Sequence, residues 1–508
     1  MASRAAKRYL LAIDLGSSRT RCIVTDLRGR VAGEASADTR LESPESLAPL
    51  GKELNPDRTW ASIGLLVKRA LRSADARANQ VLAAAATSQR QGFTLLGSTG
   101  NELYMGPNTD LRAFFEGQSL DESYGPEVYR ITGHTPSFLF APAKLRWFEA
   151  HRPDILTNTR AILSLDAWVG YKLCGETAVE RSSAAEIGLL NTSKGEWAQD
   201  LLGKLGVPQQ ILPPLLDAGS RLGTVTSRAA SATGLVPGTP VIAAGPDTQC
   251  GLLGLGVTEP GQVGIVAGWS APAQLVLDRF QLDEAARTWT GRHLLEGRWA
   301  LESNATEAGS AYRWAARNLN TDGRVDIHRH IDALAAKSPP GANGALAFLG
   351  PRPSDMGNVG SRWGGFLFPL LSDTMPVERA DLFRAVLENL GFALKSNVDQ
   401  LKEISGVSPS AIRFGGGMAR GKTLRRILAD VLGQEVAWAK SVEVPGIGAA
   451  MCAAAGIGLH AGLRDAAQAM WNPAKPIKPD PVEALEYEEH YERWVQMGTG
   501  LESLEDRL

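Results

Sequence analysis

The stretch Val241–Leu255 reads VIAAGPDTQCGLLGL, and the rest of the chain is organised around it. An apolar run stops at Gly245-Pro246, presents one acid, Asp247, and resumes as a segment of small residues. This pattern predicts a buried strand that turns directly into a helix, as in α/β folds. A carboxylate at such a junction is held rigidly and can accept a proton from a bound hydroxyl. The alternative is that Asp247 only caps the helix, and the local sequence leaves both interpretations open.

The totals of the chain exclude several classes of protein. The chain has 508 residues, which is more than one hydrophobic core usually contains, so we expect two large lobes. A net charge of -2 provides no basic field, so we expect neither nucleic acid nor membrane as a partner. The apolar run at residues 9–13 is too short to span a bilayer, and no signal-peptide core follows residue 1, so we expect a cytoplasmic protein. Four scattered cysteines lack metal-ligand or disulfide spacing.

The N-terminal half begins with an antiparallel meander. Strands are expected at residues 8–14, 20–26 and 31–37, with turns between them. Asn55-Pro56 predicts the start of a helix, because Asn is a favoured cap and Pro is tolerated in the first turn. Residues 81–87 form a continuous Val/Leu/Ala run that ends in Ser-Gln-Arg-Gln-Gly, residues 88–92. This is typical of a buried strand that delivers polar residues to a cleft.

The second half of the chain repeats the order of strands, glycine turns and helices expected in the first half. Strands expected at residues 262–267 and 273–277 flank a glycine turn, like the hairpin around Gly16. Residues 411–430 repeat the strand, glycine and helix order seen at Val241–Asp247. Two recurring elements in one order suggest a duplication and two similar lobes that face a cleft. We therefore expect domains at residues 1–254 and 255–470, followed by a Pro-rich connector and a packed helix at 471–508.

Two hairpin turns are candidate phosphate sites. They offer backbone N–H groups and hydroxyls without an acid, which suits phosphate oxygens. The residues concerned are Gly16, Ser17, Ser18, Arg19 and Thr20 in the first turn, and Gly268, Trp269 and Ser270 in the second. Asp14, just before the first turn, is the candidate for holding Mg²⁺, which prefers few carboxylates together with phosphate oxygens. The plain alternative is that each turn is only a turn.

The segment Gly416–Thr423, GGMARGKT, matches the P-loop pattern GxxxxGK[ST] between a plausible strand and a plausible helix. We find no later apolar strand ending in Asp to supply the second magnesium-binding motif of a P-loop NTPase. In the competing interpretation, Gly415, Gly416 and Gly417, with Met418, let the backbone approach an adenine and ribose. Both interpretations imply a nucleotide, and they differ on whether Lys422 contacts phosphate.

Seven segments in fixed order resemble one known family. They are IDLGSSRTR (13–21), NTDLR (108–112), PAKLRWF (142–148), AGPDTQCGLLG (244–254), AGWSA (267–271), ESNATEAGSAYRW (302–314) and FGGGMARGKTLRRILADVLG (414–433). Each segment alone is a weak signal, but together they resemble the FGGY carbohydrate kinases of the actin/hexokinase/Hsp70-like superfamily. The resemblance spans residues 9–463, and it favours the adenosine interpretation of the triple glycine.

The resemblance implies an α/β fold of two ribonuclease H-like domains around a central cleft. It also implies transfer of the γ-phosphate of ATP, with Mg²⁺, to a hydroxyl of a small sugar, ketose or polyol. Asp247 would be the general base, Asp14 the metal ligand, the two turns the phosphate sites, and the triple glycine with Met418 the adenosine site. Gln89, Arg90, Gln91 and Thr248 would bind substrate beside Asp247. A homodimer is one assembly that the sequence leaves open.

Departures from the family pattern bear on the substrate. Xylulose-type ketopentose kinases have Gly-Gln-Met-His-Gly where residues 88–92 of this chain read Ser-Gln-Arg-Gln-Gly. An arginine at the position of Arg90 is instead similar to the pattern of glycerol and autoinducer-2 kinases. Asn108 also resembles autoinducer-2 kinases, while Gln91 lacks their carboxylate and Trp269 replaces a threonine. An autoinducer-2-type hydroxyketone kinase and a ketopentose kinase are therefore both open. The alternatives from other classes are a P-loop NTPase and a non-catalytic, sugar-binding actin-like protein.

Overall fold

The computed structural model describes residues 7–319, 327–358, 363–369 and 377–505. Packing divides the chain into two compact units that each draw on separate parts of the sequence. The domains expected at residues 1–254, 255–470 and 471–508 stay a prediction. Unit 1 comprises Met1–Pro260, Val276–Ala300 and Glu443–Asn472, and unit 2 comprises Gly261–Leu275, Leu301–Val442 and Pro473–Leu508.

A six-stranded sheet forms the centre of unit 1, in the order β14-β15-β6-β1-β2-β3. The predicted meander is confirmed, because β1, β2 and β3 pair antiparallel. The buried strands β6 and β15 run parallel to β1 in the middle of the sheet. The strands are β1 (Tyr9–Leu15), β2 (Arg19–Asp26), β3 (Val31–Asp38), β6 (Val81–Ser88), β14 (Arg221–Thr224) and β15 (Pro240–Pro246).

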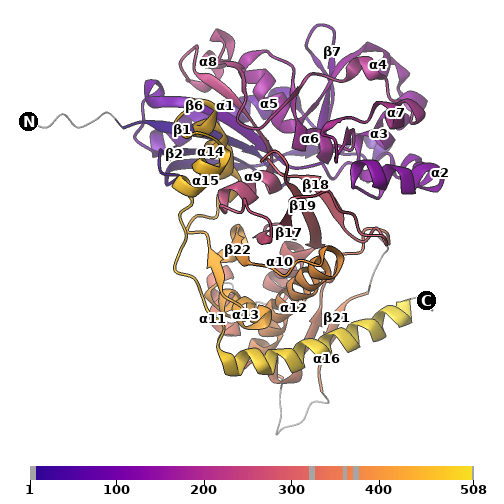
Figure 1. Cartoon of the computed structure of the whole chain (residues 1–508), viewed down its shortest axis with the longest axis vertical. Helices are drawn as coiled ribbons and strands as arrows, with labels where there is room; N and C mark the ends of the chain where they lie inside the picture. Colours follow the sequence, from indigo (N-terminus) through magenta and orange to yellow (C-terminus); the bar gives the residue numbers. More distant parts are fainter. Residues whose placement is uncertain (1–6, 320–326, 359–362, 370–376, 506–508) are drawn as a thin grey trace, which may run out of the picture. The chain divides into compact units, whose positions relative to one another are not determined.

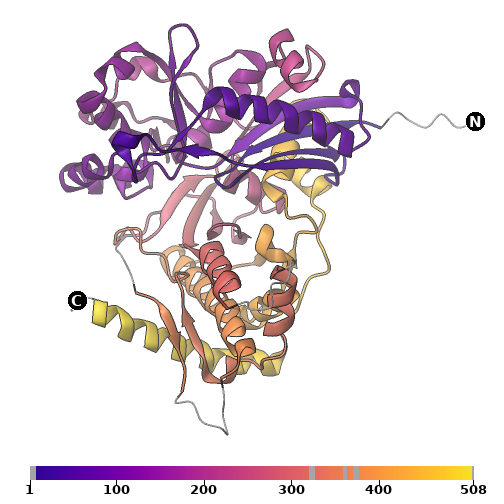
Figure 2. The same cartoon turned by 180° about the vertical axis from the view of Figure 1, so that it is seen from behind.

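Both faces of this sheet are covered. Successive side chains of β1 point to opposite faces, so each face has its own core. Leu11 and Ile13 point to the core beneath α1 (Pro56–Ser73), and Leu10 and Ala12 to the core beneath α14 (Val444–Gly456). Figure 1 shows α14 against β1 and β6 although it comes from the far end of the chain, and Figure 2 shows α1 across the opposite face. Each fully buried Leu or Ile stabilises the fold by about 1.5–3 kcal/mol.

Helix α1 begins as the sequence predicts. The side chain of Asn55 accepts a hydrogen bond from the Arg58 N–H at 3.0 Å, and Pro56 is the first helical residue. Ile63 and Val67 of its apolar stripe are buried in the core. The remaining elements of unit 1 include a three-stranded sheet of β7 (Phe93–Gly97), β8 (Glu102–Gly106) and β9 (Thr159–Ser164), and the helices α2 (Phe114–Thr132), α3 (Ala141–His151), α5 (Leu165–Cys174), α6 (Arg181–Glu186), α7 (Gln199–Lys204), α9 (Asp247–Gly254) and α15 (Leu463–Met470).

A second six-stranded sheet has the order β18-β19-β17-β16-β22-β23. Its strands β16, β22 and β23 belong to unit 2, and β18 belongs to unit 1. Strands β16, β22 and β23 are parallel, with β23 at the edge, and β17 pairs antiparallel with β16. The strands are β16 (Gln262–Val266), β17 (Ala271–Leu277), β18 (Trp289–Arg292), β19 (Trp299–Ala305), β22 (Ala411–Gly415) and β23 (Val436–Trp438). The helices are α10 (Ala308–Asn318), α11 (Ile327–Ala335), α12 (Arg379–Ser405), α13 (Lys422–Leu432) and α16 (Pro481–Glu505).

The final helix, α16, begins at Pro481, inside the segment 471–508 where a connector and a helix are expected. It packs on α12 through a buried polar cluster in which Arg384 donates to Tyr487 at 2.6 Å and to Glu388 at 2.8 Å. Figure 1 shows α16 running past α12 and α13. Within the described ranges, no helix combines the length and apolar character needed to cross a bilayer.

Candidate active site

Three parallel strands of unit 1 end at the same edge of the main sheet. Asp14 of β1 lies opposite Thr87 of β6, and Pro246 of β15 lies opposite Ser88. Ligands of open α/β sheets bind at the carboxyl ends of such strands. The register therefore brings together Asp14, the polar segment that follows Ser88, and Asp247.

Asp247 is the first residue of α9, and its side chain is partly exposed. The N-cap position is taken by Pro246, which makes no side-chain capping bond. One carboxylate oxygen of Asp247 accepts the N–H of the next residue, Thr248, at 2.8 Å. A capping side chain instead bonds to the N–H two or three residues ahead. The geometry thus differs from the capping interpretation, although an acid in the first turn is still favoured by the helix dipole.

Asp14 lies in a cluster of charges at the end of β1. Arg21 bridges the carboxylates of Asp14 and Glu443, with N–O distances of 3.5 and 3.4 Å. Burial raises the pKa of Asp14 to about 7, opposed by Arg21 and assisted by the nearby negative charges of Asp247 and Glu443. Among the described residues, the Oδ1 atom of Asp14 is buried without a hydrogen-bond partner.

Gln89 belongs to a small polar cluster at the start of the segment after β6. Its Oε1 atom accepts hydrogen bonds from the hydroxyl of Ser17 at 3.3 Å and the N–H of Asn108 at 3.0 Å. The side chain of Asn108 also donates to Ser17 at 3.0 Å. The predicted phosphate residue Ser17 is therefore joined to the predicted substrate residue Gln89.

Gln91 has a left-handed backbone with φ of 59°. This conformation is uncommon for residues other than glycine and costs about 1–3 kcal/mol, and it clusters at functional sites. The Nε2 atoms of Gln89 and Gln91 are both buried, and neither has a partner in the part of the chain that the structure describes. Two buried amide donors are thus available for a ligand with acceptor oxygens.

Arg90 is buried between a carboxylate and an aromatic ring. Its Nη1 atom lies 3.4 Å from Glu186 at the end of α6, and its guanidinium carbon lies 5.3 Å from the ring centre of Trp289. His134 also approaches Glu186, with its Nε2 atom 3.6 Å from Oε1. Although burial opposes charge, Arg90 and His134 together with the Gln249 amide hold the pKa of Glu186 down at about 2.

Glu186 also connects to the start of α9. The Gln249 amide donates to Glu186 at 2.7 Å, and the Thr248 hydroxyl donates to the other end of the same amide at 2.6 Å. The predicted substrate residues Arg90 and Thr248 therefore belong to one hydrogen-bonded network. Glu186 and Gln249 form its centre, and both are fully buried.

The predicted phosphate turn of unit 1 needs its glycine. The Gly16 N–H donates to the carbonyl of Arg19 at 3.2 Å, and a Cβ atom at Gly16 would lie 2.8 Å from that carbonyl oxygen. The Thr20 hydroxyl is buried beside Thr39, with 3.2 Å between the oxygens. Ser18 and Arg19 are exposed. The turn is formed as expected, and its role in phosphate binding stays a prediction.

Unit 2 brings its own predicted turns together. The Gly268 N–H donates to the carbonyl of Ser270 at 2.8 Å, and Trp269 is 47% exposed. Ala267, directly after β16, donates its N–H to the carbonyl of Gly415, and its own carbonyl accepts the N–H of Met418. Gly416 follows with φ of 92°, and a Cβ there would lie 2.4 Å from the Ala267 carbonyl oxygen, so only glycine fits. Gly417 faces open space, where even a Cβ meets no atom within 4 Å.

The P-loop-like segment has a different arrangement from a phosphate loop. The backbone N–H groups of Lys422 and Thr423, at the start of α13, donate to the carboxylate of Asp332 at 3.1 and 2.9 Å. The Thr423 hydroxyl donates to the backbone carbonyl of Asp332 at 2.8 Å. An internal carboxylate thus occupies the helix N-terminus where a P-loop holds phosphate. The P-loop interpretation is therefore not supported.

Replacing Lys422 with alanine is expected to leave kcat within about threefold of the wild type, because the side chain is exposed at a helix start already satisfied by Asp332. A P-loop lysine, which stabilises the transferred phosphate directly, would instead cost orders of magnitude. Steady-state measurement of ADP release checks this prediction, with Lys440→Ala as a second lysine variant. A loss of a hundredfold or more at Lys422 alone would restore the P-loop interpretation.

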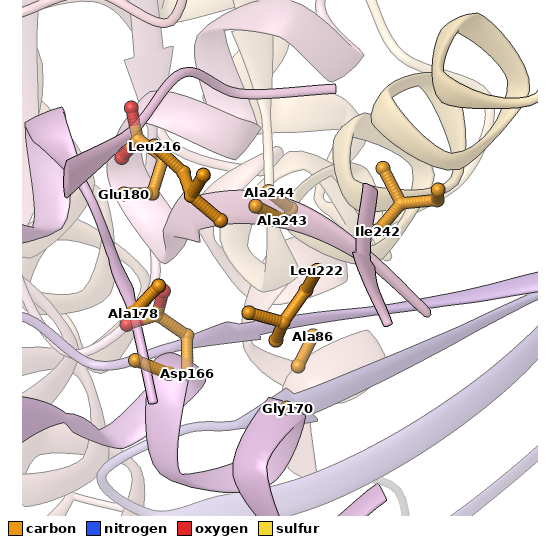
Figure 3. Close-up of a pocket in the computed structure, with 11 residues that line it drawn as sticks. Ala86, Asp166, Gly170, Ala178, Glu180, Leu216, Leu222, Ile242, Ala243 and Ala244 are labelled. Atoms are coloured by element: carbon orange, nitrogen blue, oxygen red, sulfur yellow. The ribbon is translucent and has the colours of Figure 1, made fainter. Parts of the chain in front are cut away.

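A small internal cavity lies beneath β15 and is distinct from this site. Figure 3 shows it bordered by alanine and leucine side chains, with Asp166 and Glu180 on one side. Its volume of about 20 Å³ holds one water molecule and excludes a sugar. Asp166 accepts hydrogen bonds from the hydroxyls of Ser88 and Ser183, at 3.3 and 2.9 Å. Asp166 therefore connects this cavity to Ser88 at the end of β6, where the polar segment of residues 88–92 begins.

Comparison with known proteins decides the family. The model of the N-terminal domain of the FGGY family of carbohydrate kinases matches residues 9–254, and the model of its C-terminal domain matches residues 277–457. The chain belongs to the FGGY family of carbohydrate kinases. This FGGY kinase is therefore a phosphotransferase with an alcohol group as acceptor, has the two-domain actin-like fold, and uses ATP with Mg²⁺. The cleft expected between the two domains stays a prediction.

Relatives of this FGGY kinase cover nearly its whole length. An autoinducer-2 kinase of Salmonella paratyphi A is 30% identical over 501 residues, which is 96% of this chain and 93% of the relative. An autoinducer-2 kinase of Yersinia enterocolitica is 30% identical over 98% of this chain and 96% of its own. The crystal structure of xylulose kinase from Rhodospirillum rubrum is 27% identical, with a TM-score of 0.83 over 98% of this chain and 99% of that chain.

Several residues of the network in this FGGY kinase have no signal in the sequence. Glu186 closes a short helix, and Trp289 comes about 100 residues later in β18. His134 stands alone in sequence, without a second histidine or cysteine at ligand spacing. Gln249 is the exception, because it lies inside the stretch that contains Asp247. Only the tertiary fold brings Glu186 and Trp289 to Arg90, and His134 to Glu186.

Proposed function

We propose that this FGGY kinase transfers the γ-phosphate of ATP to a hydroxyl of a small polyol, ketose or hydroxyketone, with Asp247 as the general base. The observation that carries the proposal is the position of Asp247 at the strand edge that also presents Asp14 and the Gln89–Gln91 segment. Sugar binding and the base belong to residues 1–254, nucleotide binding to residues 255–470, and residues 471–508 form the connector and packed helix.

Asp247 accepts the proton of the attacking hydroxyl in this mechanism. Its carboxylate is fixed by the Thr248 N–H at the start of a helix, so its orientation is set before substrate binds. Phosphoryl transfer depends mainly on positioning and on neutralising charge, so a single oriented acid suffices for the proton. Thr248, Gln89, Arg90 and Gln91 would hold the remaining hydroxyl and carbonyl oxygens of the substrate.

Asp14 is suited to holding Mg²⁺. It has a buried oxygen without a partner among the described residues, and no group of three potential metal-binding side chains occurs in the same part of the chain. Mg²⁺ is usually bound through one or two carboxylates and phosphate oxygens rather than by an all-protein cage, which fits a single buried acid. When bound, the ion would neutralise charge on the phosphates. Arg21 and Glu443 fix the carboxylate of Asp14 in place.

Nucleotide binding is assigned to backbone-rich turns. In unit 2, the Gly268–Trp269–Ser270 turn and the glycine turn after β22 both contact Ala267, so they form one surface. Gly415, Gly416, Gly417 and Met418 would border the adenosine, because the open space at Gly417 admits a flat ring. Gly16 to Thr20 in unit 1 and Gly268 to Ser270 in unit 2 would supply N–H groups to phosphate oxygens.

The raised pKa of Asp14 makes Mg²⁺ binding release a proton. Below about pH 7 the metal-free folded protein holds a proton on Asp14, and above that pH the carboxylate is already deprotonated. Because the ion needs the carboxylate form, binding of Mg²⁺ with ADP near pH 6 is expected to release about one more proton than near pH 8.5. Calorimetry in buffers of different ionisation enthalpy measures this difference.

Asp14→Asn provides the control for that experiment. The variant cannot titrate at this position, so any proton release that remains belongs to the nucleotide itself. Equal pH dependence in the wild type and in Asp14→Asn would contradict the assignment of Asp14 to the metal.

A substrate screen tests the proposed function directly. Purified protein is incubated with ATP and Mg²⁺ and with glycerol, erythritol, ketopentoses, ketohexoses or the autoinducer-2 precursor, and ADP release is measured. The relatives named autoinducer-2 kinase make a short hydroxyketone the first compound to test. ADP release that stays at background with every compound would favour a binding protein over a kinase.

A further inference from the structure

Arg90 and Glu186 form a buried ion pair. Arg90 and Glu186 are 9% and 2% exposed, and their side chains approach to 3.4 Å. Glu186 is held on a second side by the Gln249 amide at 2.7 Å, which fixes its carboxylate toward the network. The positive charge of Arg90 is therefore met by a full negative charge before any substrate arrives.

Two aromatic side chains, Trp289 and His134, border this pair. Trp289 stacks near Arg90 on one side, and its ring centre lies 5.6 Å from that of His134. The Nδ1 atom of His134 donates a hydrogen bond to the backbone carbonyl of Thr132 at 2.7 Å, and its Nε2 atom lies 3.6 Å from Glu186. In the low effective dielectric of such surroundings, charges interact more strongly than in water.

Two amide donors in the segment after β6 lack a protein partner among the described residues. In the described chain, the Nε2 atoms of Gln89 and Gln91 are buried and unpaired, and the backbone of Gln91 is left-handed. Amide N–H groups bind hydroxyl or carbonyl oxygens without requiring charge on them. The nearest acid in sequence to the network, Asp247, adds negative charge and would repel an anionic substrate.

We propose that Glu186 is a specificity-determining residue that neutralises Arg90 and thereby restricts this kinase to uncharged polyhydroxy substrates, excluding the corresponding sugar acids. The inference rests on the proposed function, because it concerns the same substrate site. Arg90 still donates hydrogen bonds to a neutral oxygen, but it has no uncompensated charge for a carboxylate. Glu186 acts through Arg90, so it is a positioning residue and not a catalytic one.

Charge arithmetic makes the inference testable with three proteins. The pair carries no net charge in the wild type, a net positive charge in Glu186→Gln, and none in the double variant Arg90→Gln/Glu186→Gln. The probes are three pairs of equal carbon number: glycerol and glycerate, erythrulose and erythronate, and xylulose and xylonate. Calorimetric dissociation constants with ADP present, and kcat/KM with ATP, are measured for both members of each pair.

The wild type is expected to bind the neutral member of the preferred pair at least about tenfold more tightly than its acid. Glu186→Gln is expected to shift this ratio by about 10- to 100-fold toward the acid, the range for one charged hydrogen bond. The double variant is expected to return to a neutral preference. A purely structural role for Glu186 would weaken both members alike and would not favour the acid.

Glu388→Gln is the matched control, because it removes a buried acid paired with an arginine, Arg384, in unit 2. It is expected to leave the ratio unchanged. If Glu186→Gln does not fold, the wild-type ratio and the double variant still decide: a wild type that binds acid and neutral member equally, or a double variant that prefers the acid, overturns the inference.

The two proposals fail in different ways. Neutral preference in calorimetry without ADP release would remove the proposed function and keep the selectivity of the site. Phosphorylation of a sugar acid as efficient as that of its neutral partner would remove the selectivity and keep the kinase. A wild type that binds none of the six probes counts against both.

Discussion

Asp247→Asn is expected to lower kcat by about 10²- to 10⁴-fold, the usual contribution of a general base. The change keeps the size of the side chain, and the amide oxygen can still accept the Thr248 N–H that the carboxylate accepts at 2.8 Å. Folding and ATP affinity are therefore expected to stay close to wild type, within about twofold for the dissociation constant. Steady-state ADP release and calorimetric ATP binding measure the two effects separately.

Asp200→Asn is the matched control for this variant. Asp200 is an exposed acid in the first turn of α7, as Asp247 is in the first turn of α9. If Asp247 served only the helix dipole, both substitutions would lower stability by a few tenths to about 1 kcal/mol and leave turnover intact. An Asp247→Asn protein with kcat within tenfold of the wild type would contradict the role of base.

Arg90→Gln is expected to raise KM for the sugar and to destabilise the fold. Truncating one member of a buried ion pair leaves the other charge unpaired, which typically costs 3–5 kcal/mol. Here the remaining charge is Glu186, which is fully buried and whose pKa the guanidinium helps to hold at about 2. We expect the free energy of unfolding to fall by about that amount, and kcat/KM to fall by about 10²-fold or more.

Adding Glu186→Gln to this variant separates the two effects. The double variant has no unpaired charge, so most of the lost stability is expected to return, while the loss in KM is expected to remain because Arg90 is still absent. Urea unfolding and initial-rate kinetics on the wild type, both single variants and the double variant complete the cycle. Additive losses of stability in the double variant would show that the two side chains do not act as a pair.

Much of the fold follows from local patterns. The Asn55-Pro56 cap predicts the start of α1, and the apolar run that stops at Gly245-Pro246 predicts the junction of β15 and α9 to within a residue. These succeed because capping and strand burial are properties of short segments. The duplicated hairpins at Gly16 and Gly268 are likewise formed where expected.

The charge network is the part that local patterns could not supply. Arg90 is predictable from the polar segment after β6, but its partner Glu186 lies about 100 residues away at the end of a six-residue helix. Nothing in the composition of that helix distinguishes Glu186 from a surface acid. The same applies to Asp332, whose bonds to Lys422 and Thr423 alter the meaning of a motif that matches a P-loop letter by letter.

The discontinuous make-up of unit 1 has a consequence for biosynthesis. The face of its sheet formed by Leu10, Ala12 and Ile242 is covered by α14, which lies at Val444–Gly456. A ribosome adds about 5–20 residues per second, so this apolar surface stays unfinished while residues 255–442 are translated. The nascent chain therefore exposes an incomplete apolar core during that interval. This face of the sheet is the surface on which a chaperone is expected to bind. Truncation before residue 443 would leave the same surface permanently open.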